Sequence, residues 1–499
     1  MGRLNYKIIG SFLGLIVMLN GLFMLLSAPF SLYQHEKAAI QILAAGTFTV
    51  FLGFLLWFFN RKAPKTVQKR EGYLIVTLGW VALTLTGAIP YVFTGTIPNL
   101  PSAIFETISG YSTTGASIIN DIEALPNGIL IWRSATHWIG GMGIIVLTIA
   151  ILPLLGIGGM QLFMAEAPGP STDKMHPRIT QTAKRLWLIY VSLTFTEFLL
   201  LKIAGMTWFD ALNHAMATMS TGGFSTKNAS MAYWNHAPAI QYIVIAFMFI
   251  AGTNFVLTYF ALKGKVQKVF QNEEFTYYFF GAIGLTLAIT GLVYFFEPSD
   301  VVATIAHPKP WGAFESAFRH SAFQVVSIMT TTGFVSADYT LWTPLATLLI
   351  FSLFFVGGSA GSTSGGIKIV RHVVMIKNSL LEFKKLLHPN AIIPVRYDGT
   401  SVSRPIIFTI LSFFVLYMLI FISSAVVFSL FGLDFSSAMS AAASCLGNVG
   451  PALGSLGPVN NYANLSDAAQ LFCAFLMLIG RLELFTVLIL FTPYFWKKS

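Results

Sequence analysis

Apolar residues gather into long runs along most of this chain, separated by short polar stretches. Runs of about 20 apolar residues are long enough to cross the core of a bilayer as helices. The first run is not followed by an A-x-A cleavage site, so we expect a retained span and not a signal peptide. The pattern predicts ten spans, near residues 6–28, 37–60, 72–95, 132–155, 185–206, 239–263, 275–297, 341–376, 405–432 and 467–495. The expected fold is an all-α polytopic membrane protein.

Four further apolar segments are too short to cross a membrane and too apolar to face solvent. They lie at 101–112, 208–219, 316–330 and 434–447. Each leads into a short turn, and the turns read Ser-Thr-Thr-Gly (112–115), Met-Ser-Thr-Gly (219–222), Thr-Thr-Thr-Gly (330–333) and Gly-Asn-Val-Gly (447–450). We interpret the four segments as re-entrant half-helices. The unit of span, half-helix, turn and second span then occurs four times around one pore.

This repeat sets the expected domain organisation, and repeats of this kind decide the whole architecture. Two leading spans and a basic loop occupy residues 1–70. The four pore repeats follow at 71–182, 183–273, 274–403 and 404–499.

The four turns have the composition of a cation filter. Non-helical backbone is tolerated at membrane depth only where it lines a cavity or is buried in protein. Glycine tolerates positive φ and so lets carbonyl oxygens turn toward a shared axis, and rings of carbonyls can replace the hydration shell of a cation. The negative C-terminal ends of the half-helices favour cations as well. The predicted filter residues are Thr113, Thr114, Gly115, Ser220, Thr221, Gly222, Thr331, Thr332, Gly333, Asn448, Val449 and Gly450.

The fourth turn differs most from the other three, because it has no Thr-Thr pair. Both Gly447 and Gly450 are candidates for its filter glycine. A serine stands six residues before the glycine in the first and third repeats, and Ser444 stands in that place before Gly450. The register of this turn is left between the two glycines, with Gly450 favoured.

Composition and charge agree with a membrane protein. Hydrophobic residues make up 55% of the chain and charged residues 10%, whereas soluble domains carry about 25% charged residues. Most of the 30 basic residues fall on one set of alternate loops, which predicts cytoplasmic termini by the positive-inside rule. The opposite side is expected to hold only Lys37, Arg133, Lys227, Lys309 and Arg319. Topology therefore explains the net charge of +10 without a nucleic-acid partner.

Two features are candidates for a gate. The predicted span 341–376 is too long and is interrupted by Gly357, Gly358, Gly361, Gly365 and Gly366, a composition that cannot hold a helix. Arg481 lies in the middle of the last span, where a guanidinium must face water or a partner. The alternatives are an ordinary loop between two shorter helices and a structural ion pair, respectively.

The residues exclude other chemistry. Cys445 and Cys473 have no metal-type spacing. The sequence shows no nucleophile and base at a sensible spacing, so we expect no enzyme. Glu106 and Asn213 on the half-helices could touch the mouth of the pore, but helix-fixing contacts are an equal alternative.

These residues resemble the Trk/Ktr/HKT superfamily of potassium transporters, and most closely its TrkH branch. The resemblance covers nearly the whole chain and rests on Gly115, Gly222, Gly333, Gly450, Arg481 and the break at 357–366. It implies potassium uptake across the bacterial inner membrane through a filter gated by the intramembrane loop and by Arg481. Plant relatives that pass sodium carry serine at the first filter position, so Gly115 implies potassium selectivity.

The resemblance also implies partners. A homodimer and a cytosolic, NAD-binding TrkA-like regulatory subunit are expected, with potassium as the substrate and no cofactor in this chain. Uptake would be driven by the membrane potential, which supplies about 2.3 kcal/mol per charge per 100 mV. The alternative function is a potassium symporter coupled to protons or sodium, in which Glu197 or Glu483 would carry the coupling proton.

Overall fold

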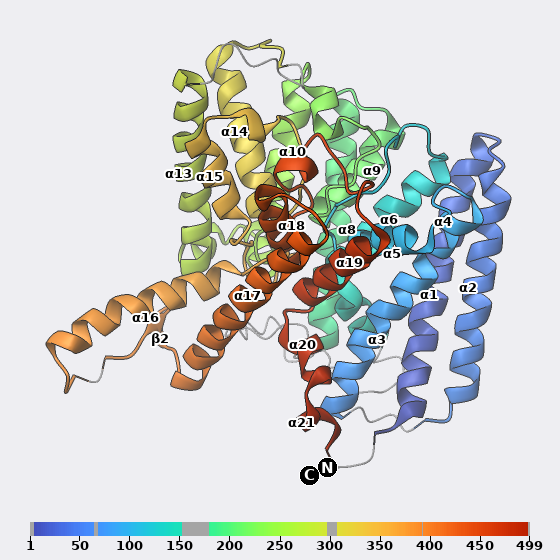
Figure 1. Cartoon of the computed structure of the whole chain (residues 1–499), viewed down its shortest axis with the longest axis horizontal. Helices are drawn as coiled ribbons and strands as arrows, with labels where there is room; N and C mark the ends of the chain where they lie inside the picture. The colour runs from blue at the N-terminus through green and yellow to red at the C-terminus, as the bar shows by residue number, and fades with distance from the viewer. Residues whose placement is uncertain (1–3, 64–67, 152–178, 297–306, 392, 498–499) are drawn as a thin grey trace.

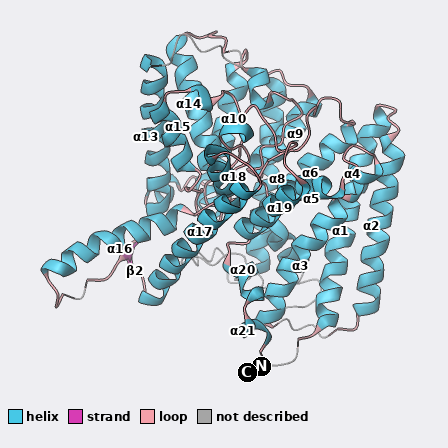
Figure 2. Ribbon diagram, in the orientation of Figure 1, coloured by secondary structure: helices cyan, strands magenta, loops and turns pink. Residues whose placement is uncertain are grey.

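The computed structural model describes residues 4–63, 68–151, 179–296, 307–391 and 393–497. The described chain is almost entirely helical (Figures 1 and 2). One two-stranded hairpin pairs β1 (Arg396–Tyr397) with β2 (Thr400–Ser401) in antiparallel register. Asp398 and Gly399, both with positive φ, form its tight turn, as the twist of a two-residue hairpin requires.

Two leading helices, α1 (Tyr6–Tyr33) and α2 (Ala38–Asn60), lie side by side along their length. Gly14 and Gly53 face each other, and a Cβ on either would lie within 3.0 Å of backbone atoms of the partner helix. Small residues of this kind let helix backbones approach closely in a membrane. Phe48, Phe51 and Phe59 of α2 are exposed, as lipid-facing side chains would be. This pair forms one end of the molecule in Figure 1.

Four units follow, each with a first span, a short half-helix and a second span. The first spans are α3 (Lys69–Gly87) with α4 (Ile89–Phe93), α8 (Ile179–Ile203), α13 (Glu273–Phe296) and α17 (Arg404–Leu430). The half-helices are α5 (Leu100–Tyr111), α9 (Trp208–Met219), α14 (Ala313–Met329) and α18 (Phe435–Gly447). These bounds agree with the predicted half-helices to within three residues.

The second spans are all interrupted. They are α6 (Asn127–Ile151), α10 (Pro238–Ala251) with α11 (Phe255–Leu262), α15 (Pro344–Leu353) with α16 (Ile369–Leu387), and α19 (Asp467–Arg481) with α20 (Phe485–Leu488). The pair α10–α11 bends by 113° and the pair α19–α20 by 107°. Within α6, Gly143 has non-helical dihedrals of φ 66° and ψ 162°. Non-helical backbone thus recurs in every second span.

Short connecting elements complete the described fold. They are η1 (Ser230–Trp234), α12 (Val266–Phe270), η2 (Tyr339–Leu341), η3 (Gly454–Leu456), η4 (Ile489–Phe491) and α21 (Pro493–Trp496). The start of α1 and the end of α21 lie at the same end of the molecule, at the bottom of Figure 1.

The helix lengths define a multi-pass membrane protein. Among the described residues, six helices are long and apolar enough to cross a membrane, and eight if each bent pair is one span. The predicted spans 132–155 and 275–297 both run past the described residues, since these stop at Ile151 and Phe296. The all-α architecture with four repeated units after two leading helices is confirmed.

Candidate functional site

Each half-helix ends in the same backbone turn. In the first repeat, the N–H of Thr113 donates to Gly110 O and the N–H of Thr114 donates to Ser109 O. This pair of bonds is the Schellman motif, which closes a helix with one residue in the left-handed conformation. The same two bonds recur in every repeat. The longer bond of the pair runs from the N–H of one residue to the carbonyl oxygen five residues before it, and it joins Thr114 to Ser109, Gly222 to Ala217, Thr332 to Ser327 and Val449 to Ser444.

The left-handed residue of this motif is usually glycine, but here it is not. Thr113, Thr221, Thr331 and Asn448 have φ between 54° and 55°. A β-branched residue at positive φ is an outlier, and such strain of roughly 1–3 kcal/mol per residue gathers at functional sites. Three threonine outliers, with Asn448 in the same conformation in the fourth repeat, indicate a site that all four repeats build together.

A glycine with positive φ follows two residues later in each turn. These glycines are Gly115 (φ 80°), Gly223 (φ 82°), Gly333 (φ 78°) and Gly450 (φ 107°). In the second repeat the glycine with positive φ is therefore Gly223, one position after the predicted filter glycine Gly222. Gly222 instead takes the place of Thr114, Thr332 and Val449. In the fourth repeat the structure favours Gly450, since Gly447 is the last residue of α18.

The four turns close into one ring. A Cβ on Gly115 would lie within 3.0 Å of Gly222 O, and one on Gly223 within 3.0 Å of Thr332 O. A Cβ on Gly333 would meet Val449 O, and one on Gly450 would meet Thr114 O, at similarly short range. Each glycine thus touches the carbonyl of the next repeat, and the fourth repeat returns to the first. Glycine is required at these positions for two reasons: its positive φ is strained for other residues, and a Cβ would collide with the neighbouring carbonyl oxygen.

The carbonyl oxygens of this ring make no internal hydrogen bonds. No described residue donates a hydrogen bond to the carbonyl oxygen of Thr114, Gly222, Thr332 or Val449. Buried carbonyl groups are almost always paired. Four carbonyls without an internal hydrogen bond, on one ring at the negative ends of four half-helices, have the chemistry that a cation site requires.

Side chains behind the ring hold the turns in place. Ser109 Oγ donates to Ala116 O at 2.6 Å, and Ser327 Oγ donates to Phe334 O at 2.7 Å. His137 Nδ1 lies 2.6 Å from Gly110 O, and the N–H of Phe224 donates to His137 Nε2 at 3.1 Å. A carbonyl can only accept and an N–H can only donate, so this histidine is singly protonated on Nδ1 and joins the first turn to the second.

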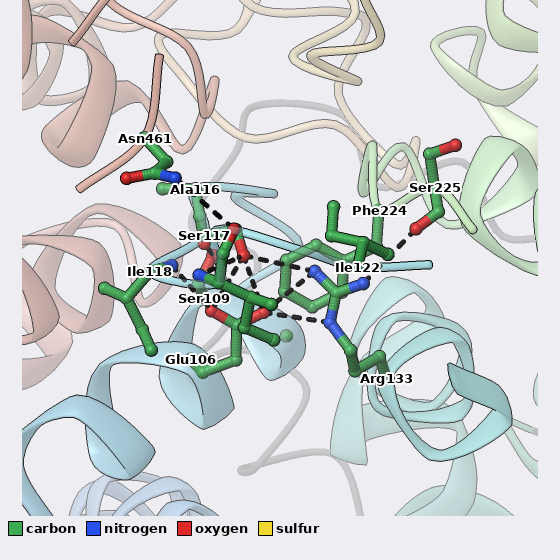
Figure 3. A network of polar contacts seen from close by, with 12 residues as sticks. Glu106, Ser109, Ala116, Ser117, Ile118, Ile122, Arg133, Phe224, Ser225 and Asn461 are labelled. Carbon is green, nitrogen blue, oxygen red and sulfur yellow. Dashed lines mark hydrogen bonds and ion pairs between the residues drawn. The ribbon is translucent and has the colours of Figure 1, made fainter. Parts of the chain in front are cut away.

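A buried ion pair lies beside the first turn (Figure 3). Arg133 of α6 and Glu106 of α5 are 2.8 Å apart, and both side chains are inaccessible to solvent. The sequence predicts Arg133 and Arg319 on the outer side, within the predicted segments 132–155 and 316–330. The structure places both on helices, and both are buried. Arginine is amphipathic enough to enter a helix where a carboxylate neutralises it, so charge alone does not mark a loop.

The glycine-rich segment 357–366 lies directly against the turns. The N–H of Gly365 donates to Thr331 Oγ1 at 2.6 Å, and Thr363 Oγ1 donates to Met219 O at 3.1 Å. The segment also bonds to the break of the second repeat, where the N–H of Ser359 donates to Gly252 O at 2.9 Å. It is therefore an ordered loop held against the inner ends of two half-helices, and its predicted gating role remains a prediction.

Arg481 reaches the same region from the last repeat. Its Nη1 donates to Thr363 O at 2.8 Å, and its Nη2 donates to Gly140 O at 2.6 Å. One guanidinium thus joins the glycine-rich segment to the first repeat's second span. Glu483, two residues on, pairs with Arg371.

The remaining candidates have structural contacts. Asn213 Oδ1 accepts from Ser134 Oγ at 2.7 Å, which is a helix-fixing contact. Both cysteines are free and buried. Within the described ranges no group of three or more His, Cys, Asp or Glu residues could hold a metal ion.

Sequence reasoning missed Gly223 and the Glu106–Arg133 pair. A signal for Gly223 existed, because the small residue Ala217 stands six residues before it, where the other repeats have serine. The pair had no signal, since its partners lie 27 residues apart on different helices.

Fold and site together define a class: a multi-pass membrane protein in which four repeats enclose one ring of free carbonyls. A family model described as a cation transport protein, TrkH, matches residues 38–498. The Trk system potassium uptake protein TrkH of Escherichia coli strain K12 is 39% identical over 500 residues, which cover 99% of this chain and all of that protein. TrkG of the same strain is 32% identical over 505 residues and the full length of both proteins.

A solved structure agrees with these matches. The crystal structure of the potassium transporter TrkH from Vibrio parahaemolyticus matches with a TM-score of 0.86 and 35% sequence identity, over 99% of this chain and all of that one. The chain belongs to the TrkH family of cation transport proteins. The family consists of transporters and not of enzymes.

Proposed function

We propose that this protein takes up potassium across the bacterial inner membrane through the ring of carbonyls. The filter comprises the predicted residues of the four turns together with Gly223. The observation that carries the proposal is the closed ring, in which four carbonyl oxygens without internal partners meet at the ends of four half-helices. The relatives' names, which state potassium uptake, support the choice of ion.

The path continues past the glycine-rich segment and Arg481. A cation leaving the ring meets the backbone of 357–366 and then the guanidinium charge. Both lie against the inner ends of the turns through the contacts of Gly365 and Thr363. We assign to them the role of a gate that limits leak, opened by displacement of the segment. Uptake is driven by an inside-negative potential acting on one positive charge.

The same proposal includes orientation and partners. Both termini face the cytoplasm, by the bias of basic loops. The protein acts as a homodimer with a cytosolic, NAD-binding TrkA-like regulatory subunit. These statements rest on family resemblance and on charge distribution, and cross-linking with mass measurement of the purified complex tests the homodimer and the regulatory subunit.

The test of the filter is ion flux in reconstituted vesicles. Wild-type protein should take up rubidium, a potassium substitute, and exclude sodium and lithium. Gly115→Ser should admit sodium and lower the preference for potassium by about tenfold or more. Its Cβ would lie within 3.0 Å of Gly222 O, which is closer than any normal contact, so that carbonyl must move. An unchanged preference in correctly assembled Gly115→Ser would refute the role given to the ring.

A symporter coupled to protons or sodium is the second candidate. Glu197 is fully buried in α8 beside Thr218 of α9, and buried carboxyl groups in spans mark proton relays in some transporters. Glu483 is less suited, because it is engaged with Arg371. A reversal potential that follows the potassium gradient alone, at several values of pH and sodium, would exclude coupling.

A further inference from the structure

The ion pair between Glu106 and Arg133 holds two turns of the ring at once. Glu106 accepts from the N–H of Ile118 at 3.0 Å and from Ser117 Oγ at 3.1 Å, and these donors stand three and two residues after Gly115. Arg133 donates from Nη1 to Ser225 O at 3.2 Å. Figure 3 shows the guanidinium between the carboxylate and the second turn.

Arg133 has a second contact with the same turn. Its guanidinium lies 4.0 Å from the centre of the Phe224 ring, a cation–π contact that is stronger when desolvated. Phe224 and Ser225 follow Gly223 directly, so they move with the carbonyl of Gly222. The pair therefore fixes the distance between the first and second quarters of the ring.

Equivalent positions in the other repeats are neutral. The residue nine before the left-handed glycine is Glu106 in the first repeat, and His214, Gln324 and Ala441 in the others. His214 Nε2 lies 2.9 Å from Ser225 Oγ. Gln324, with its amide oxygen facing the backbone, accepts from the N–H of Ser336 at 2.8 Å. A neutral side chain is thus sufficient to hold one turn.

A buried charge pair needs a reason, because neutral groups of similar size would avoid its desolvation cost. Ionic groups reach further and align more strongly than neutral ones, since Arg133 presents five donors in a rigid fork. Here the fork spans from one repeat to the next. The ion pair therefore serves to fix the geometry between the first and second turns, and not to stabilise either turn alone.

We infer that Glu106 and Arg133 are positioning residues that set the discrimination between potassium and sodium at the junction of the first and second turns. The inference rests on the proposed filter function. Neither residue touches the ion. Their effect is transmitted through the backbone from Ser117 and Ser225 to the carbonyls of Thr114 and Gly222.

The experiment measures the potassium-to-sodium permeability ratio and the yield of assembled protein. Glu106→Gln keeps an oxygen for the N–H of Ile118 but removes the charge opposite Arg133. We expect the ratio to fall by roughly tenfold while potassium flux persists, in line with the coupling seen within buried networks. A purely structural role would lower the yield and leave the ratio of the assembled protein unchanged.

A second variant covers the case in which Glu106→Gln does not assemble. Phe224→Leu removes the stacked ring but leaves both charges paired, so it should fold. We expect a smaller fall of the ratio, by about threefold, because the bond to Ser225 O remains. A wild-type ratio in assembled Phe224→Leu, together with a wild-type ratio or failed assembly in Glu106→Gln, overturns the inference.

The matched control lies at the same junction but on the surface. Lys227 and Glu123 join the same two loops at 3.6 Å, with side chains 20% and 42% exposed. Exposed pairs contribute little, so Glu123→Gln should leave the ratio unchanged. If wild-type protein shows no preference for potassium, the proposed function fails. If wild type and the Glu106 and Phe224 variants share one high ratio, only this inference fails.

Discussion

The four turns of the ring are alike in backbone conformation, whereas the four interruptions in the second spans differ from one another. Four turns of different sequence share one backbone, with left-handed residues at φ 54–55° and the same pair of helix-closing bonds. The four breaks share no conformation, since one is a single glycine, two are sharp bends and one is the segment 357–366. Under the proposed function, one ion contacts all four turns at once, which requires the turns to be equivalent. The proposed gate needs only one moving segment, so the other three interruptions are free to differ.

The largest expected effect on transport comes from distorting one of the four turns of the ring. Gly223→Ala places a methyl group at φ 82° and within 3.0 Å of Thr332 O. We expect rubidium uptake per assembled protein to fall by about tenfold or more, because the carbonyl must move away. Gly222→Ala tests a different contact, because its Cβ would lie within 3.0 Å of Cγ of His137 and would displace the histidine that joins the first turn to the second.

A control separates backbone strain from damage to the ring. Gly205 also has positive φ, at 107°, but a Cβ there would meet nothing within 4 Å. Gly205→Ala should lower stability by roughly 1 kcal/mol and leave selectivity unchanged. Equal loss of transport in both variants would mean that strain alone is responsible.

The next effect tests the layer beneath. Arg481→Ala removes the donor to Thr363 O and Gly140 O and also removes the charge from the path. We expect potassium flux to rise by about tenfold, because of these bonds only the one to Thr363 O holds the glycine-rich segment, and a charge-assisted hydrogen bond is worth roughly 1.5 kcal/mol. Deletion within 357–366 should act in the same direction.

The comparison variant is Lys377→Ala. Lys377 pairs with Glu273 at partly exposed positions, so flux should not change. A fall in flux of Arg481→Ala, with assembled protein at the wild-type level, would show that the arginine supports the open path and does not obstruct it.

The contrast also explains what the sequence could reveal. The ring could be predicted because its turns repeat, and repetition makes a weak local pattern informative. The position of Gly223 was harder to predict, because two glycines stand side by side and the spacing from Ala217 is a weaker signal than the positive φ that the structure shows. The Glu106–Arg133 pair was hidden because its two residues lie 27 positions apart on separate helices. The contacts of Arg481 were equally hidden, since backbone carbonyls leave no trace in sequence.

The smallest expected effect lies where the two regions meet. Thr331 Oγ1 accepts the N–H of Gly365 at 2.6 Å, whereas Thr221 Oγ1 donates to the adjacent Ser220 O. Both residues have φ 55°, so valine strains both turns alike. Thr331→Val leaves a buried N–H on the glycine-rich segment without a partner, at a cost of about 1–3 kcal/mol. The segment should then leave its closed position more often, and flux should rise by about fivefold in Thr331→Val but not in Thr221→Val. Equal flux in the two variants would mean that the bond between Thr331 and Gly365 has no bearing on gating.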